Sequence, residues 1–458
     1  MEMKKYKLEN LCTKITDGSH YSPVAVESGY PMFSVKDMEE FGFSYTDVKL
    51  ISEDDFQKMC ENDCVPQKND VLVAKDGSYL KEAFVCMETK KEAILSSIAI
   101  FRPNIKLVNP YYLAYLFKTP NVYNYVTNGC VSGTALPRIV LKAFKQIEVF
   151  IPSLKQQNNV VSVLSSLDNK IALNKRINAR LEALAKRLYD YWFVQFDYPD
   201  KNGKPYKTSG GKMVWNEVLK REIPVGWEVK RLEELFITNR GVSYSTKTIT
   251  GDVGIPMINL ASFSPDGSYK IDGIKLYTGD YSQEKVLKPF DLVMCNTQQT
   301  AIDFSKDIIG KALLIPDIFE GDITSSHHVN TLKVHDEKLK FYLYRLFNTD
   351  YFHAYISHFA SGTNILGLDF AGVENYTAVI PSDEILSKFA DFTLNIEKKK
   401  SEIIRENKKL TDLRDRLLPL LMNGQVSVGT NNSSEFCNAK LGKQATACDM
   451  NGQVEVEG

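Results

Sequence analysis

Two long stretches, nearly free of proline and glycine, constrain the fold of this chain more than any other feature. The first extends from Ser153 to Val194 and the second from Ser382 to Gly424, with Pro419 near its end. Apolar residues recur in both at steps of three and four, which predicts helices with the narrow apolar stripe of a coiled coil. At 1.5 Å per residue such helices are about 60 Å long. Each follows an Ile-Pro-Ser step, where the serine suits a helix N-cap, and Gln156 would complete a capping box in the first.

The apolar stripe predicts the seam between the two helices. Three polar residues fall at seam-like positions, Asn174, Lys399 and Glu406, and can fix the register of a coiled coil. The aromatic end of the first helix is predicted to pack on the Leu417-Leu418 end of the second, or partly to face a partner subunit; that end is Tyr189, Tyr191, Trp192 and Phe193. The predicted seam and docking residues are Leu167, Ile171, Leu181, Leu188, Trp192, Phe392, Ile396, Ile403, Leu410 and Leu417.

The sequence contains an internal duplication. Ser132-Gly133-Thr134 recurs as Ser361-Gly362-Thr363, 229 residues later, and the Ile-Pro-Ser steps recur at the same separation. Ser96-Ser97 is matched at the same separation with Ser325-Ser326, and the helical segment 112–119 matches 342–349 at a separation of 230. Such a steady separation predicts a duplicated globular domain, each copy followed by a long helix.

The bulk composition is that of a cytoplasmic globular protein. A length of 458 residues predicts two to three domains, and no apolar run or leader predicts membrane insertion or secretion. The eight cysteines are scattered and predict reduced thiols; Cys60 and Cys64 have the spacing of half a zinc site, without a second pair nearby. A net charge of −1 argues against a generally polybasic nucleic-acid binder but allows a local basic face.

The fold class predicted is α+β: two duplicated, mostly β domains with short helices, and two long antiparallel coiled-coil helices. Expected strands include 71–74, 98–101 and 147–151 with partners at 292–294, 312–315 and 378–380, and expected helices are 110–118 and 338–348. The predicted organisation is domain 1 at 1–152, helix 1 at 153–194, a polar connector at 195–226, domain 2 at 227–381, helix 2 at 382–424 and a disordered tail at 425–458.

No convincing catalytic constellation is visible. There is no phosphate-binding loop, and Asn109-Pro110-Tyr111-Tyr112 lacks the second proline of the adenine-holding motif of amino-methyltransferases. Pro316-Asp317 with Asp336 and Lys338 satisfies a permissive nuclease pattern, but Asp336 is better placed for a turn and helix cap. The pair His327-His328 is matched with Ile98-Ala99 and is therefore expected in a strand or at a strand edge, with a structural role.

The sequence supports a binding function better than a catalytic one, because polar loops recur in both halves with different residues. Such side chains suit the edges of bases and the phosphates of DNA, as two readers of unlike sequences would require. The long helices also carry basic residues in excess, although paired, solvated charges explain most of them. The predicted DNA-contacting residues are His20, Tyr21, Lys75, Ser78, Tyr79, Arg138, Arg240, Tyr244, Asn296, Gln298, Gln299, Lys306 and Asn364.

Taken together, these features resemble the specificity subunit of a Type I restriction-modification system, over residues 8–424. The resemblance is most specific at the Ile-Pro-Ser entries, at Asp168-Asn-Lys-Ile171, at the helix exit 188–194 and at the connector, including Ile223-Pro-Val-Gly-Trp227. The first half lacks the Pro-x-Gly-Trp lead-in, which leaves the start of its domain less defined.

The resemblance implies two target recognition domains, each reading one half of a bipartite, asymmetric site in double-stranded DNA. It implies that the helix pair sets the gap and docks two methyltransferase subunits, and that two restriction (translocase) subunits join them. S-adenosylmethionine, ATP and Mg²⁺ are expected on those partners; for this chain no cofactor, metal or catalysis is expected. Two other interpretations remain: a single-chain restriction enzyme, which would need methyltransferase and nuclease motifs, and a coiled-coil adaptor, which would not explain the duplicated loops.

Overall fold

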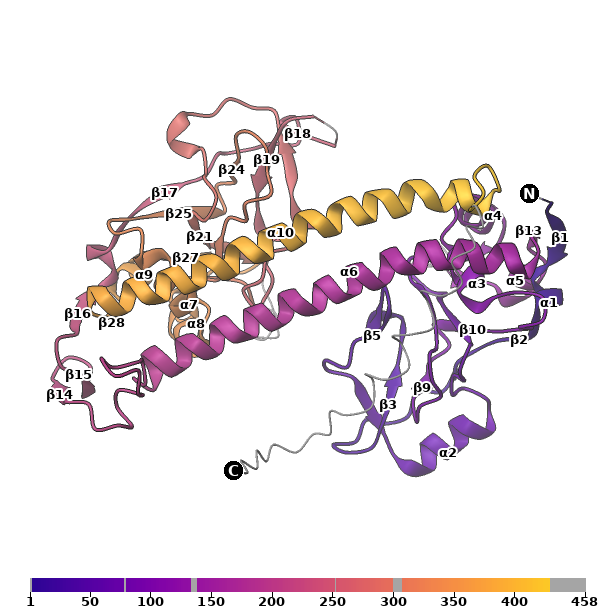
Figure 1. The fold of residues 1–458 in the computed structure, drawn as a ribbon, viewed down its shortest axis with the longest axis horizontal. Coiled ribbons are helices and arrows are strands. Elements are labelled where there is room, and N and C mark those ends of the chain that lie inside the picture. Colours follow the sequence, from indigo (N-terminus) through magenta and orange to yellow (C-terminus); the bar gives the residue numbers. More distant parts are fainter. Residues whose placement is uncertain (1, 78–79, 133–137, 252, 300–306, 429–458) are drawn as a thin grey trace. The chain divides into compact units, whose positions relative to one another are not determined.

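The structure is a computed structural model that describes residues 2–77, 80–132, 138–251, 253–299 and 307–428 (Figure 1). The chain divides into two compact units. Unit 1 comprises Met1–Asn169 together with Asp412–Gly458, and unit 2 comprises Lys170–Thr411. The tail expected at 425–458 lies outside the described residues from 429 onward. Among the described residues, every helix is too short or too polar to span a bilayer.

Unit 1 is built on a four-stranded antiparallel sheet in the order β2-β10-β7-β8. Strand β7 reads Val-Leu-Val-Ala and is buried throughout, because apolar clusters cover both of its faces. The strands are β1 (Lys4–Lys7), β2 (Cys12–Asp17), β3 (Tyr30–Phe33), β4 (Met38–Glu39), β5 (Gly42–Phe43), β6 (Lys49–Ile51), β7 (Val71–Ala74), β8 (Ala83–Val85), β9 (Ala93–Ile94), β10 (Ile98–Pro103), β11 (Val131–Ser132), β12 (Arg138–Ile139) and β13 (Glu148–Ile151). The short helices are α1 (Leu8–Leu11), α2 (Glu53–Glu61), α3 (Pro110–Phe117), α4 (Pro120–Gly129) and α5 (Leu141–Lys145).

Unit 2 repeats this plan with the sheet β17-β25-β21-β23, also antiparallel. Its strands are β14 (Met213–Asn216), β15 (Arg221–Pro224), β16 (Glu228–Arg231), β17 (Phe236–Arg240), β18 (Ile249–Thr250), β19 (Ile255–Ile258), β20 (Lys275–Tyr277), β21 (Leu292–Cys295), β22 (Thr297–Gln299), β23 (Ala312–Leu314), β24 (Thr324–Ser325), β25 (Val329–Val334), β26 (Ala360–Ser361), β27 (Ile365–Leu368) and β28 (Thr377–Ile380). The short helices are α7 (Leu339–Phe347), α8 (Asp350–Ser357) and α9 (Ala371–Asn375). The predicted α+β class, the duplication and the strands and helices named from the sequence are confirmed.

The two long helices are also confirmed, as α6 (Leu154–Tyr189), which ends in a π-helical turn at Asp190–Val194, and α10 (Asp383–Met422) (Figure 1). At the start of α6, Gln156 accepts hydrogen bonds from the backbone N–H of Ser153 at 3.3 Å and from its hydroxyl at 3.0 Å. These bonds satisfy a backbone donor that the first turn leaves free, as the predicted capping box requires.

Within each unit the parts of α6 and α10 run antiparallel. In unit 1, Val160 and Leu164 share a core with Leu418 and Leu421. In unit 2, Asn174 is 1% exposed and donates from Nδ2 to Glu406 at 2.8 Å and to Asn407 at 2.9 Å. Asn174 therefore lies in the seam with Glu406, as predicted.

Two predictions about the helices are wrong. The aromatic end of α6 packs on Phe389, not on Leu417-Leu418: the Phe193 and Phe389 ring centroids are 4.8 Å apart, and those of Trp192 and Phe389 are 6.0 Å apart. An antiparallel partner necessarily places the end of α6 beside the start of α10. Lys399 lies outside the seam: its side chain is 59% exposed and pairs with Glu402 at 2.9 Å.

The segment 195–226, expected to be a polar connector, forms part of the core of unit 2. Phe196 and Tyr198 are buried, and Tyr198 stacks on Trp227 at 5.0 Å between ring centroids. The hairpin β14–β15 follows them. The segment joins the core, rather than forming a polar connector, because the aromatic residues spaced through it supply apolar surface that turn residues alone do not.

Candidate nucleic-acid interface

In unit 1, three loops meet at one end of the sheet. Strands β2 and β7 end where β10 begins, because both are antiparallel to it. Backbone hydrogen bonds hold the loops together: Gly18 N–H donates to Ile98 O at 3.2 Å, and Lys75 N–H donates to Ser97 O at 2.9 Å. We call this set of loops, at residues 17–21, 75–77 and 95–97, the unit 1 loop cluster.

Unit 2 has the same arrangement at the corresponding end of its sheet. Gly241 N–H donates to Val329 O at 3.2 Å, and Asn296 N–H donates to His328 O at 3.0 Å. The turn at 326–328 closes on the loop after β17 through His327 N–H, which donates to Val242 O at 2.8 Å. Residues 240–244, 296–298 and 326–328 form the unit 2 loop cluster.

One glycine in each cluster is required by the same kind of close contact between two backbone segments. A Cβ atom on Gly18 would lie 2.2 Å from the carbonyl oxygen of Ile94, and one on Gly241 would lie 2.2 Å from that of Ser325. Only glycine permits the two backbones to approach so closely. The duplication therefore preserves the contact between the loops, while the side chains around it differ.

These contacts correct the predicted alignment of the two halves. Ser96 and Ser97 occupy the turn before β10, and the residues in the equivalent turn before β25 are His327 and His328. The match of Ser96-Ser97 with Ser325-Ser326 is therefore wrong by two residues. The histidines lie in the turn directly before β25, at the edge of the strand rather than within it. The sequence comparison matched two identical Ser-Ser pairs, although the two copies are shifted against each other by two residues at this point.

In unit 1 the predicted contact residues divide into exposed and buried side chains. His20 and Tyr21 are exposed, and His20 Nε2 lies 3.4 Å from a carboxylate oxygen of Asp17. Arg138 is half-exposed and pairs with Asp76 at 3.1 Å. Lys75 is only 3% exposed and its Nζ forms an ion pair with Asp17, so it holds the loop in this conformation. The predicted contacts Ser78 and Tyr79 lie outside the described residues.

In unit 2 three of the seven predicted contact residues hold the loops in place. Asn296 Nδ2 donates to Asn330 Oδ1 at 2.7 Å, and Gln298, 4% exposed, accepts from the backbone N–H of Ile308 at 2.7 Å. Arg240 is exposed and donates from Nε to the carbonyl oxygen of His327 at 2.9 Å.

The remaining unit 2 candidates lie on either side of these loops. The ring of Tyr244 lies 5.4 Å from that of His327. Gln299 ends β22 and pairs in register with Ile365 of β27, directly after the exposed Asn364. Lys306 lies outside the described residues. The assignment of these residues to DNA contact stays a prediction.

The sequence did not single out three residues of this surface: His327, His328 and Lys275. The two histidine rings are 3.9 Å apart, and Lys275 Nζ lies 5.3 Å from the centroid of the Tyr244 ring. The histidine pair was noticed in the sequence, but the wrong alignment of the serines meant that the pair was not assigned to the loops.

A second set of polar contacts fixes each sheet domain to the long helices of its own unit. In unit 1, Tyr115 of α3 donates to Asp168 of α6 at 2.5 Å, and Arg414 of α10 donates to the same carboxylate at 2.9 Å. Arg414 also pairs with Glu40. The site is buried or half-buried, so each charge depends on its partner.

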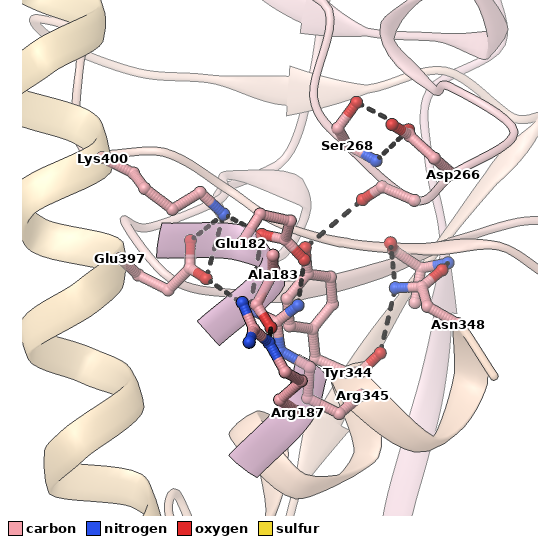
Figure 2. A network of polar contacts seen from close by, with 12 residues as sticks. Glu182, Ala183, Arg187, Asp266, Ser268, Tyr344, Arg345, Asn348, Glu397 and Lys400 are labelled. Carbon is pink, nitrogen blue, oxygen red and sulfur yellow. Dashed lines mark hydrogen bonds and ion pairs between the residues drawn. The ribbon is translucent and has the colours of Figure 1, made fainter. Parts of the chain in front are cut away.

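In unit 2 the equivalent helix supplies a buried arginine (Figure 2). Arg345 of α7, 5% exposed, pairs with Glu182 of α6 and, at 3.0 Å, with Glu397 of α10. Lys400 completes the network, 2.6 Å from Glu182 and 2.9 Å from Glu397. Two cations and two carboxylates leave no net charge. We call these four residues the Arg345 network.

The pKa of Glu182 reflects this balance. Burial favours its neutral form, but Arg345 and Lys400 outweigh burial and lower the pKa from 4.5 to about 2. Burial likewise opposes the charged forms of Arg345 and Lys400, whereas the surrounding charges raise the pKa of each. Glu182, Arg345 and Lys400 are therefore ionised at neutral pH.

The predicted seam and docking residues fall into three groups by exposure. Ile171, Ile396 and Ile403 are 2%, 6% and 4% exposed, as expected of a seam. Phe392 is 40% exposed and faces solvent. The other residues of the set are partly buried, at Leu167, Leu181, Leu188, Trp192, Leu410 and Leu417.

The catalytic-looking motifs have structural roles. Asn109 caps α3, accepting from the backbone N–H groups of Tyr111 and Tyr112 at 2.8 and 3.3 Å. Asp336 accepts from the backbone N–H of Lys338 at 3.0 Å, in the predicted turn. Cys60 is exposed and Cys64 is buried in an apolar cluster. Across the described parts of the chain, no three His, Cys, Asp or Glu side chains are grouped as metal ligands.

Comparisons with known proteins agree with this architecture. The chain is 27% identical to the Type I restriction enzyme MjaIX specificity subunit of Methanocaldococcus jannaschii, over 69% of each chain. It is 24% identical to the Type I restriction enzyme HindI specificity subunit of Haemophilus influenzae, over 79% of this chain and 87% of the relative. The crystal structure of the Type-I restriction-modification system S subunit from M. genitalium shares its fold, with a TM-score of 0.52 and 14% identity over 92% of this chain and 96% of that one.

The most extensive match is to a family model. The model of the Type I restriction modification DNA specificity domain matches twice, over residues 1–183 and 224–409. The two matches cover both copies of the duplication, including their sheets and most of both long helices. The chain therefore belongs to the family of Type I restriction-modification specificity subunits.

Proposed function

We propose that this chain is the DNA-reading component of a Type I restriction-modification complex. Each unit reads one half of a bipartite, asymmetric site in double-stranded DNA through its loop cluster. The helix pair sets the gap between the half-sites and docks two methyltransferase subunits. Two restriction subunits complete the assembly, which would act in the cytoplasm.

The observation that carries the proposal is the pair of loop clusters. The same end of the same sheet carries them in both units, on the same close glycine contact. Their side chains differ, with His20, Tyr21 and Arg138 in one and Arg240, Tyr244 and the histidine pair in the other. Conserved geometry with different polar groups is what two readers of unlike sequences need, because base-edge contacts determine specificity.

The helices offer apolar surface for a protein partner. Leu173, Leu184, Phe392 and Leu413 are 45%, 44%, 40% and 45% exposed, although they lie on coiled-coil helices with buried seams. Leu173, Leu184 and Phe392 belong to unit 2 and Leu413 to unit 1, and such exposed apolar side chains can contact a protein partner. We assign the methyltransferase subunits to this surface.

The chemistry belongs to those partners in this proposal. Methyltransferase subunits would bind S-adenosylmethionine and methylate adenine, and restriction subunits would use ATP and Mg²⁺. This chain would supply the recognition of the DNA site. Affinity would come largely from phosphate contacts and would fall with salt, whereas discrimination would come from a few loop side chains.

Co-expression with methyltransferase subunits, followed by methylome sequencing, tests the proposal. The expected result is adenine methylation at one bipartite, asymmetric motif that appears only when this chain is present. Methylation by the chain alone would favour a single-chain enzyme. Methylation that proceeds at the same sites without it would contradict the proposal and favour an adaptor.

A further inference from the structure

The histidine pair of the unit 2 loop cluster has ring nitrogens with no partner. His327 and His328 occupy the turn between β24 and β25 and are half-buried. Nδ1 of each ring is fully buried and lacks a hydrogen-bond partner. Within the described residues no hydrogen bond reaches either Nε2, and neither Nε2 is a fully buried atom. The Nε2 atoms are therefore the ring nitrogens of this loop that a ligand can reach and pair with.

The neighbours of His328 favour its neutral form. Burial lowers the pKa of His328, and His327, Arg240 and Lys275 lower it further, so His328 is neutral at physiological pH. A neutral imidazole carries its proton on one nitrogen only. With the proton on Nε2, a ring of the pair presents a hydrogen-bond donor at its more accessible nitrogen.

The surroundings hold these donors in position. Arg240 donates from Nε to the carbonyl oxygen of His327 at 2.9 Å. The Tyr244 ring lies 5.4 Å from that of His327 and 6.2 Å from that of His328. Rings held by packing lose little entropy on binding, as a specific contact requires. In unit 1 the equivalent residues are serines, and Ser97 accepts a hydrogen bond from Val35 N–H at 3.0 Å.

We propose that His327 and His328 are specificity-determining contacts of unit 2, which donate from Nε2 to the N7 atoms of purines in the major groove. A donor without acceptor capacity at that nitrogen selects acceptor positions, which guanine and adenine present at N7. Arg240, Tyr244 and Lys275 flank the pair and suit the adjoining phosphates. The inference rests on the proposed function, because it assigns residues to one of the two readers.

Single-atom changes in the DNA test this contact. The wild-type complex with its methyltransferase subunits first gives the motif by methylome sequencing. Duplexes then carry 7-deazaguanine or 7-deazaadenine at one purine at a time, and affinity is measured by fluorescence anisotropy. We expect wild type to lose affinity by about 3- to 10-fold at one or two purines of a single half-site, the effect of a lost hydrogen bond.

The variants then connect that loss to the histidines. In His327→Ala and His328→Ala the penalty for the deaza base should disappear at one position each, as a double-mutant cycle requires. His327→Gln and His328→Gln should restore part of it, because glutamine can place an N–H donor near Nε2. His335→Ala is the matched control, because His335 follows the other end of β25, about 20 Å away along the strand.

The outcomes separate the two claims. A wild-type motif whose deaza penalties persist in both alanine variants overturns this inference alone. An equal loss of affinity for every duplex would show phosphate contact and also overturns it. No bipartite motif with the wild-type chain would overturn the proposed function and this inference with it. Melting curves that match wild type exclude misfolding of the variants as the cause.

Discussion

Removing Arg345 from its network should destabilise unit 2 strongly. Arg345→Ala leaves Glu182 and Glu397 half-buried or buried with Lys400 as their remaining cation. Breaking a buried ion pair from one side costs about 3–5 kcal/mol, because the remaining charge has lost its partner but not its desolvation. We expect a loss of that size in the free energy of unfolding.

The chain offers both a selective probe and a matched control. Its three tryptophans, Trp192, Trp215 and Trp227, all lie within unit 2, so tryptophan fluorescence during urea unfolding reports on that unit. Arg405 also forms an ion pair in unit 2, with Asp317 at 2.6 Å, but both side chains are over 40% exposed. Arg405→Ala should cost no more than about 1 kcal/mol, as exposed pairs do.

The pH dependence gives a second readout of the same network. The pKa of Glu182 is about 2 in the folded protein, against the 4.5 of an ordinary exposed glutamate, which stands for the unfolded chain. A lowered folded pKa adds stability that is present above pH 4.5 and is lost as the pH falls towards 2, about 3 kcal/mol in all. Without Arg345 this pH-dependent part should shrink. A loss no larger than that of Arg405→Ala, or an unchanged acid limb, would refute the role given to the network.

Three further predictions concern the helices. Inserting or deleting about a heptad in both α6 and α10 should change the gap in the methylated motif and leave both half-sites unchanged, as methylome sequencing would show; an altered half-site would count against the spacer role. Trp192→Ala should lower the free energy of unfolding by about 2–3 kcal/mol or weaken subunit assembly, whereas Trp215→Ala, at a residue 54% exposed, should do neither; if both variants behave alike, the packing on Phe389 is unimportant. Asn174→Ala should cost about 1–2 kcal/mol in urea unfolding through two lost hydrogen bonds, and no change would show that the seam does not depend on them.

The sequence predicted features with a strong period and missed those set by contacts between distant residues. Ile396 and Ile403 repeat at seven residues and are buried, as periodicity requires. Lys399 lies between them at a seam-like step. It is exposed because extending its flexible, charged side chain into solvent costs less free energy than burying it. The aromatic end of α6 needed the direction of the partner helix, which local sequence does not contain.

The loops were the least predictable part. Asn296 and Gln298 have the side chains of DNA readers, yet both bond to neighbouring protein groups, because a polar loop must also satisfy its own hydrogen bonds. His327 and His328 were discarded through a register error of two residues, which only the pairing of the strands resolves. Composition alone thus identified the kind of surface but not its individual contacts.

The boundary between the units bears on which part of the chain could be exchanged as one piece. It falls inside the helices, after Asn169 and after Thr411, so residues 170–411 form one contiguous block. Exchange of that block between related genes would carry the whole Arg345 network with it and leave Tyr115, Asp168 and Arg414 together in the recipient. Exchange at the Ile-Pro-Ser steps would instead separate Tyr115 from Asp168. Recombination within the helices could therefore pair existing sheet domains in new combinations without requiring the buried charges of either network to find new partners.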